Sequence, residues 1–182
     1  MPISIPALRI VVLSISLLFC IAPPVLAAPS PGPNACAANL QSRQLDFWLG
    51  DWKVTAPGSS PNAASRVYLA LDKCAVIESW DGGRGHRGQN IFAYSADDGA
   101  WHGMFLDNEG RMHILNGALD ADGAVVFTGP SRAPDGHKVL NRVRIVSVGP
   151  NEVRQISQKS SDNGASWSAE YSGDYTRKPT AR

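Results

Sequence analysis

Short stretches of β-branched and aromatic residues recur along most of the chain, separated by clusters of Gly, Pro, Asp and Asn. Beyond residue 43, no window of about 11–18 residues keeps apolar side chains at the period of an amphipathic helix. Brief apolar runs between turn-forming residues are typical of β-strands. The pattern predicts an all-β domain with strands at about 46–56, 63–71, 74–82, 89–96, 100–106, 111–118, 123–129, 138–148, 151–159 and 166–177.

The connections between these strands carry the chemistry of tight hairpins. Asp, Asn and Gly gather in them, as in Asp97-Asp-Gly99, Asn108-Glu-Gly110 and Asp162-Asn-Gly164. These residues adopt the positive φ that hairpin turns need. Consecutive hairpins build an antiparallel meander, and about ten strands hide their edges most completely by closing into an up-and-down β-barrel. A sandwich of two sheets is the alternative architecture.

The N-terminal residues have the pattern of a secretory signal peptide. Arg9 precedes an apolar run of about 13 residues, and small residues follow that run. A membrane-spanning anchor is the alternative, although crossing the hydrocarbon takes roughly 20 residues. We expect a secreted or periplasmic protein without a membrane span, divided into a cleaved signal peptide (1–27), a Pro-rich linker (28–43), the barrel domain (44–177) and a disordered tail (178–182).

The charge balance argues against a polyanionic partner. The 182 residues include 17 Lys and Arg and 16 Asp and Glu, which gives a formal net charge of +1. A domain that binds nucleic acid is expected to carry a basic excess. We therefore expect no nucleic-acid partner. Hydrophobic residues make up 43% of the chain, enough for one packed core.

Export changes the interpretation of the cysteines. Cys20 leaves with the signal peptide, and the mature chain keeps Cys36 and Cys74. Two cysteines in an oxidising compartment pair by default. We expect one disulfide between Cys36 and Cys74, which ties the N-terminal segment to an interior strand. Two buried free thiols are the alternative.

The string Asp46-Phe-Trp-Leu-Gly-Asp-Trp52 resembles the signature of a bacterial family of exported or cytosolic lipocalin-like domains. Its last three residues are similar to the Gly-x-Trp motif of lipocalins and related calycin barrels. Further blocks match the pattern of the family in order: Asp72-Lys-Cys-Ala-Val-Ile-Glu-Ser-Trp80, Gly99-Ala-Trp-His102, Asp107-Asn-Glu-Gly110, Val153-Arg-Gln-Ile156 and Ser161-Asp-Asn-Gly-Ala-Ser-Trp167 through Gly173-Asp-Tyr175. The resemblance covers about residues 44–177. It implies a lipocalin-like barrel and assigns no activity.

The same resemblance implies structural roles for three residues. Gly50 permits a bend or a close backbone approach within its strand, and Trp52 lies on the same face and can plug one end of the barrel. In lipocalins an arginine from near the last strand covers this tryptophan, and Arg177 is the matching candidate here. The contact would be a cation–π interaction. An Arg177 that lies in solvent with the tail is the alternative.

Glu78 is the strongest candidate for acid–base chemistry. In the strand 74–82 it shares a face with Val76 and Trp80. Enclosure among apolar neighbours would raise the pKa of this carboxyl and suit it to general acid–base catalysis. Alternation defines two faces without saying which one points inward, so a solvent-facing Glu78 is the alternative.

His102 and His113 lie on neighbouring strands of a predicted hairpin. A turn centred near residues 107–108 would place the two side chains opposite each other. We consider His102 a second candidate acid or base and His113 a ligand contact. Zinc sites use three or four protein ligands, and the spacing places no third ligand beside this pair. The sequence predicts no metal and no cofactor.

Aromatic residues are numerous, and they either fill the lumen or line a pocket for a flat ligand. The glycine-rich segment 82–88 is expected to form a mobile loop at the barrel mouth. The expected partner is a small hydrophobic or aromatic molecule, bound by Trp80, Tyr94, Trp101, His113, Gln155, Trp167 and Tyr171. The sequence thus predicts a binding barrel. The alternative is a small enzyme that uses Glu78 or His102 on a ligand in the same cavity.

Overall fold

Within residues 35–179, the part of the chain that a computed structural model describes, three short helices precede ten strands. The predicted signal peptide lies outside these residues. The helices are α1 (Ala35–Ala38) and the 3-10 helices η1 (Gln41–Arg43) and η2 (Asp46–Trp48). The strands are β1 (Gly50–Thr55), β2 (Ala64–Ala70), β3 (Ala75–Gly83), β4 (His86–Ser95), β5 (Ala100–Asp107), β6 (Met112–Leu119), β7 (Val125–Arg132), β8 (Lys138–Gly149), β9 (Glu152–Ser160) and β10 (Ser168–Arg177).

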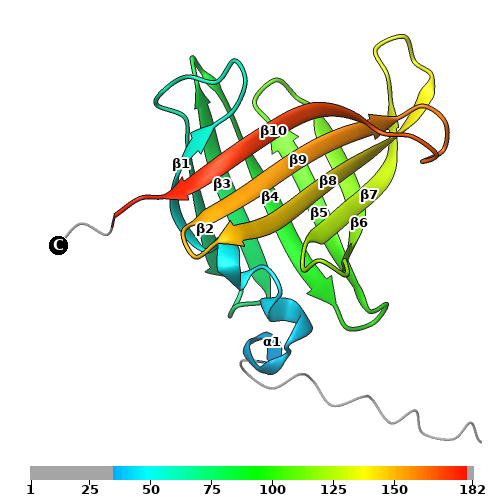
Figure 1. Cartoon of the computed structure of the whole chain (residues 1–182). Helices are drawn as coiled ribbons and strands as arrows, with labels where there is room; N and C mark the ends of the chain where they lie inside the picture. The colour runs from blue at the N-terminus through cyan, green and yellow to red at the C-terminus, as the bar shows by residue number, and fades with distance from the viewer. Residues whose placement is uncertain (1–34, 180–182) are drawn as a thin grey trace, which may run out of the picture. The chain divides into compact units, whose positions relative to one another are not determined.

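The strands form a closed barrel in which each one pairs antiparallel with its neighbours in sequence and β1 pairs with β10 (Figure 1). Closure gives both edges of every strand a hydrogen-bonding partner. The prediction of an all-β, up-and-down barrel is confirmed, and the sandwich alternative is wrong. We call the end where β1 begins the lower end and the end with the β3–β4 turn the upper end, as they lie in Figure 1.

The first strand begins at Gly50, later than the predicted residue 46. Residues 46–48 instead form η2, in which the Trp48 amide donates to the Leu45 carbonyl at 3.0 Å. Consecutive apolar residues in this segment lack the alternation of a half-buried strand. The helical turn carries the Trp48 side chain fully into the interior, with 0% of its surface exposed.

The glycine-rich segment is part of a tight hairpin, so the prediction of a mobile loop at 82–88 is wrong. Strand β3 continues to Gly83, and strand β4 begins at His86. Only Arg84 and Gly85 connect them, and both have positive φ, 57° and 86°. Two such residues are the signature of a type I′ turn, whose twist matches that of the flanking strands. The upper end of the barrel therefore carries a short turn at this position, beside a shift in the β3–β4 register between Asp81 and Gly83.

Large aromatic side chains fill the lower half of the lumen. Trp48, Trp52, Trp101, Phe92 and Phe127 are each at most 1% exposed. Their rings pack tilted or edge to face, with centroids 5.7 Å apart for Trp48 and Phe92 and 5.1 Å apart for Phe92 and Phe127. These are favourable aromatic geometries in addition to the apolar area that the rings bury. The lower half of the barrel is thus a solid core.

Arg177 covers the plug residue Trp52 and does not lie in solvent. Its guanidinium carbon lies 4.2 Å from the centroid of the Trp52 ring. The guanidinium also donates to the carbonyls of Leu49, at 2.6 Å, and Phe47, at 3.3 Å. Gly50 has a φ of 133°, and a Cβ there would lie 2.3 Å from Arg177 Nη1. Glycine is therefore required at position 50 both for its backbone conformation and for its contact with Arg177.

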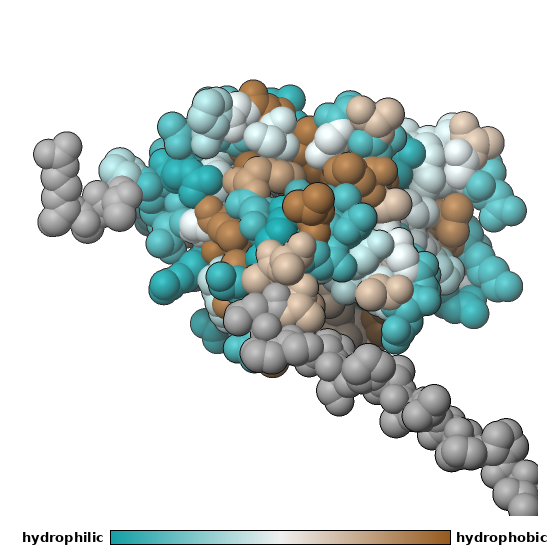
Figure 2. All heavy atoms as spheres, turned by 90° about the horizontal axis from the view of Figure 1, so that it is seen from below, coloured by the Kyte–Doolittle hydropathy of each residue, from teal (hydrophilic) through white to brown (hydrophobic). Residues whose placement is uncertain are grey.

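The predicted disulfide is confirmed, with Cys36 in α1 joined to Cys74 in the turn before β3. The turn contains Leu71, Asp72 and Lys73, all with positive φ. Side chains disfavour this conformation, and the disulfide holds the turn together with a hydrogen bond of 2.5 Å from Arg43 Nη2 to the Lys73 carbonyl. The outer surface at the lower end mixes polar and apolar residues (Figure 2).

Replacing the plug residue should destabilise the barrel. We expect Trp52→Ala to lower the free energy of unfolding by about 3–5 kcal/mol, because it leaves a large cavity in a packed core. Trp167→Ala is the matched control, since Trp167 is only partly buried, between β9 and β10. Chemical denaturation measures both. An unchanged midpoint for Trp52→Ala would show that the ring does not support the core.

Reduction of the disulfide should also destabilise the protein. The bond closes a loop with a sequence separation of 38, and the loop-entropy estimate for such a loop is about 3–4 kcal/mol. We expect the free energy of unfolding to fall by this amount in reducing agent, and a Cys36→Ser variant to be insensitive to it. Two titratable thiols in the unfolded, unreduced chain would contradict the pairing.

Candidate functional site

The upper half of the lumen is hollow. A cavity of about 450 Å³ opens beside the β1–β2 loop and the β3–β4 turn. Trp80, Phe105 and Tyr171 contribute aromatic wall, and the polar residues Glu78, Asn90, Gln155 and Tyr175 also line it. Alternation along the strands places these side chains on the inner face, above the aromatic core.

Glu78 is completely buried at the base of this cavity, with 0% of its surface exposed. Its Oε1 accepts hydrogen bonds from Ser65 Oγ at 2.8 Å and from the Tyr175 hydroxyl at 3.0 Å. Its Oε2 accepts from Asn90 Nδ2 at 2.6 Å. The neighbouring strands β2 and β4 supply Ser65 and Asn90, and Asn90 lies directly opposite Glu78 in the β3–β4 pairing. Tyr175 comes from β10, which does not pair with β3. Glu78 therefore points inward, and the alternative of a solvent-facing glutamate is wrong.

The hydroxyl of Tyr175 links Glu78 to Gln155. It lies 3.0 Å from Glu78 Oε1 and 2.9 Å from Gln155 Oε1, but it has only one proton to donate. A proton on Glu78 satisfies both contacts, because the carboxyl then donates to Tyr175 and Tyr175 donates to Gln155. When Glu78 is ionised, Tyr175 donates to the carboxylate and Gln155 must turn its amide. The direction of this hydrogen-bond chain therefore depends on the charge of Glu78.

Burial raises the pKa of Glu78 from its ordinary value of 4.5 to about 6, although the hydrogen bonds from Ser65, Asn90 and Tyr175 oppose the shift. Within residues 35–179, no Lys, Arg or His side chain forms an ion pair with this carboxyl. Burial and the neighbouring Glu78 charge raise the pKa of Tyr175 well above its ordinary range. The cavity base thus holds one group that changes charge near neutral pH.

Three of the predicted ligand contacts meet at this cavity. Trp80, Gln155 and Tyr171 line it together with Glu78. The imidazole of His86 packs edge to face against Trp80, with ring centroids 4.8 Å apart, at the mouth. Tyr171 is largely buried, which raises the pKa of its phenol. The site therefore combines Glu78 and Trp80 from β3 with Gln155 from β9 and Tyr171 from β10.

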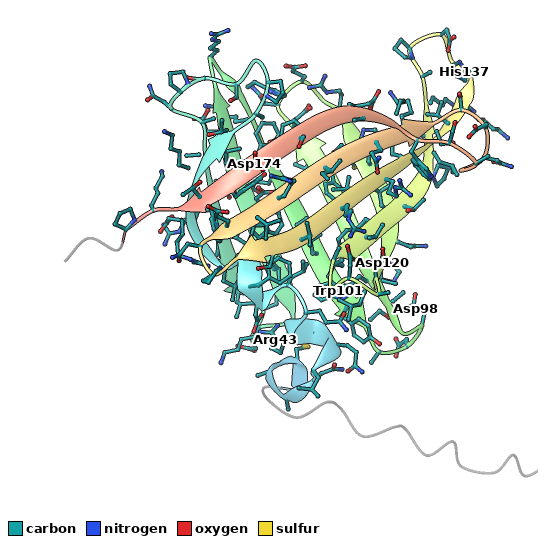
Figure 3. The ribbon with its side chains drawn as sticks, in the orientation of Figure 1. Arg43, Asp98, Trp101, Asp120, His137 and Asp174 are labelled. Atoms are coloured by element: carbon teal, nitrogen blue, oxygen red, sulfur yellow. A yellow bond between two sulfur atoms is a disulfide. The ribbon has the colours of Figure 1, made fainter. Side chains whose placement is uncertain are left out.

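The other predicted aromatic contacts lie elsewhere. Trp101 is at the lower end, as Figure 3 shows, where its Nε1 donates to Gln44 Oε1 at 2.8 Å. Tyr94 packs against it, with ring centroids 6.0 Å apart. The guanidinium of Arg142 stacks over Trp167, with its central carbon 4.0 Å from the centroid of the Trp167 ring. None of these three aromatic residues lines the cavity that contains Glu78.

His102 and His113 do not face each other, so that expectation is wrong. The β5–β6 register pairs His102 with Asn116 and Phe105 with His113. The pairing is thus offset by an odd number of residues from the predicted register, and an odd offset moves a side chain to the opposite face. His102 is on the outer face, 2.9 Å from Asp98 and 3.1 Å from Asn116, and it is remote from the cavity.

Sequence reasoning missed Ser65, Asn90 and Tyr175 as members of the site. Asn90 had a usable signal, because a two-residue turn at 84–85 places it close to the position opposite Glu78. Tyr175 lies on the inner face of the last strand, two residues before Arg177. Its contact with Glu78 crosses the barrel seam, and no local pattern encodes it.

Comparison with known proteins adds no family to these observations: no protein-family model matches the chain, and no curated protein matches its sequence. Within the described part of the chain, no group of three His, Cys, Asp or Glu side chains is placed to hold a metal ion. No helix among residues 35–179 is long and apolar enough to cross a membrane.

The raised pKa of Glu78 makes stability depend on pH. As pH rises from 4.5 to about 6, the unfolded chain loses this proton before the folded chain does, so stability falls. Above that window the full cost is about 2 kcal/mol for this buried carboxyl. We expect the wild type to lose about this much more stability than Glu78→Gln between about pH 4 and 7. Denaturation at several pH values measures the free energy of unfolding of both proteins. An equal change for the wild type and Glu78→Gln across this range would contradict the prediction.

Proposed function

We propose that this protein is an exported, lipocalin-like barrel that binds a small apolar or aromatic molecule in the upper cavity. In this proposal the ligand carries a hydrogen-bond donor that reaches Glu78. The observation that carries the proposal is a hollow, aromatic-walled space that ends on a buried carboxyl without a cationic partner among the described residues.

The size and lining of the cavity support this function. A volume of about 450 Å³ lies within the range of roughly 300–1,000 Å³ that is common for small-molecule sites. Such sites are mostly apolar and contain a few polar groups that fix the orientation of the ligand. Trp80, Phe105 and Tyr171 supply the apolar contacts, whereas Glu78 and Asn90 supply the polar ones.

Three further observations support the lipocalin-like and exported parts of the proposal. The stacking of Arg177 on Trp52 beside Gly50 matches the arrangement that the Gly-x-Trp resemblance implies. The disulfide between Cys36 and Cys74 suits an oxidising compartment. The N-terminal pattern of charge, apolar run and small residues suits a signal peptide.

Glu78 favours ligands that donate a hydrogen bond. Above about pH 6 it is ionised, and its negative charge is desolvated and hydrogen-bonded only by neutral groups. An amine or hydroxyl of the ligand would compensate that charge, and hydrogen bonds to charged groups are stronger than those between neutral ones. A purely hydrocarbon ligand would leave the charge uncompensated.

A small enzyme is the second candidate, and the pKa of Glu78 favours it. A carboxyl with a pKa of about 6 can both accept and return a proton near neutral pH. The partner predicted for it, His102, lies on the outer face of the barrel and cannot act on the same ligand. Glu78 would have to act with the hydroxyl of Tyr175, which lies 3.0 Å away.

Native mass spectrometry of protein purified from its own host tests the proposal. We expect a bound small molecule that is lost under denaturing conditions. Glu78→Gln should weaken its binding roughly tenfold or more, because the hydrogen bond to a charged group is lost. His102→Ala is the control and should retain the molecule.

Two other outcomes are informative. A wild-type protein that carries no molecule, and gains none from an extract of its host, would contradict the binding function. A bound molecule that changes mass during incubation with the wild type, but not with Glu78→Gln, would favour the enzyme.

A further inference from the structure

A second cavity lies beside the first at the upper end. It has a volume of about 700 Å³ and is lined by residues of β5 to β10. Phe105, Ser157 and Tyr171 line both cavities. The two spaces are therefore neighbours within one lumen, and these shared side chains lie between them.

One row of side chains on the inner face connects the two cavities. Glu78 pairs with Asn90, Asn90 pairs with Phe105, and Phe105 pairs with His113. Four neighbouring strands thus present a carboxyl, an amide, an aromatic ring and an imidazole in succession. With strands about 4.8 Å apart, the two ends of the row are separated by about 14 Å along the wall. An extended aromatic molecule of two rings fits this length.

The far end of the row is a polar group with unused hydrogen-bonding capacity. Nδ1 of His113 lies 3.2 Å from Asn141 Nδ2, from which it accepts a hydrogen bond, and 3.4 Å from Ser131 Oγ. Its Nε2 then carries the ring proton and is a donor. Asn141 is only 9% exposed, and its Oδ1 is buried without a hydrogen-bond partner. A buried amide oxygen without a partner is costly, and a ligand donor would satisfy it.

Four cationic side chains line this end of the second cavity, and two of them, Lys159 and Arg111, form ion pairs. Lys159 forms an ion pair with Glu170 at 2.5 Å, and Arg111 forms one with Asp107 at 2.7 Å. The other two, Arg132 and Arg142, donate to neutral groups, the Gly136 carbonyl and Gln158 Oε1, both at 2.9 Å. Burial, Lys159 and Arg111 lower the pKa of His113, so its ring is neutral at pH 7. The neutral His113 ring, which donates from Nε2, and the unpartnered Asn141 Oδ1, which accepts, together fit a group that both accepts and donates, such as a hydroxyl.

We propose that the two cavities form one elongated binding site, in which a ligand places an amine or other donor at Glu78, an aromatic middle against Phe105 and a hydroxyl at His113 and Asn141. This inference rests on the proposed function and specifies its ligand class. Each end of the row then has a defined partner. The Glu78 carboxylate accepts a hydrogen bond from the ligand, and His113 and Asn141 contact a ligand group that both donates and accepts hydrogen bonds. The aromatic middle packs between Phe105 and the ring of Tyr171.

A pair of probe molecules tests this arrangement. One is 4-(aminomethyl)biphenyl, which carries only the amine; the other is its 4′-hydroxy derivative, which carries both polar ends. Isothermal titration calorimetry measures the affinity of each probe for the full mature protein. We expect the hydroxyl to improve affinity about threefold to tenfold, the effect of one hydrogen bond.

Variants of the protein test where the hydroxyl of the second probe binds. Asn141→Leu should abolish the gain from the hydroxyl, so that this variant binds the two probes with the same affinity. Asn116→Leu makes the same replacement on the outer face of β6 and should keep the gain. His113→Phe is a second variant that removes the same end, and it serves if Asn141→Leu does not fold.

The outcomes separate this inference from the proposed function. If the monofunctional amine binds in a manner that depends on Glu78, but the hydroxyl adds nothing, the elongated site is wrong and the proposed function stands. A gain that survives both Asn141→Leu and His113→Phe also overturns the elongated site. If neither probe binds, the elongated site is wrong, and native mass spectrometry of the protein from its host decides the proposed function separately.

Discussion

The contact between Trp52 and Arg177 lies at the seam of the barrel, where the first strand meets the last. The β1–β10 register places these two residues directly opposite each other, and the guanidinium stacks on the indole while donating to two carbonyls of the entering chain. This pair is one of four that close the sheet between β1 and β10, and it also seals the lower end. The same register carries Tyr175, which pairs with Val54, onto the inner face.

Tyr175 connects this seal to the candidate site. Its ring packs edge to face against Trp48, with centroids 5.7 Å apart, and lies 6.5 Å from Trp52. Its hydroxyl points away from this core and reaches Glu78 at 3.0 Å. The apolar lower half and the polar base of the cavity thus share one side chain. Large rings occupy the lower lumen, and the space above them is left to the ligand.

Much of the fold could be predicted from the sequence, because it depends on local patterns. Turn residues and alternation locate the ten strands, and two cysteines in an exported chain indicate the disulfide. The inward orientation of Glu78 could not be predicted, since alternation leaves two equivalent faces and only closure of the barrel selects one. Whether His102 and His113 share a face depends on the register of one hairpin, and the observed register, offset by an odd number of residues, puts them on opposite faces. Tyr175 reaches Glu78 across the closed seam, far from it in sequence.

Both ends of the described chain leave from the sealed end of the barrel. The disulfide fixes α1 beside the turn before β3, and the Lys178 amide donates to the Asp51 carbonyl at 2.8 Å, next to the plug (Figure 1). Both ends of the described segment, residues 35 and 179, are therefore remote from the turns around the mouth. A fusion partner or immobilising tag joined directly at Ala35 or Pro179 would therefore be attached on the sealed side, which allows the barrel to be tethered to a surface by the end opposite its entrance.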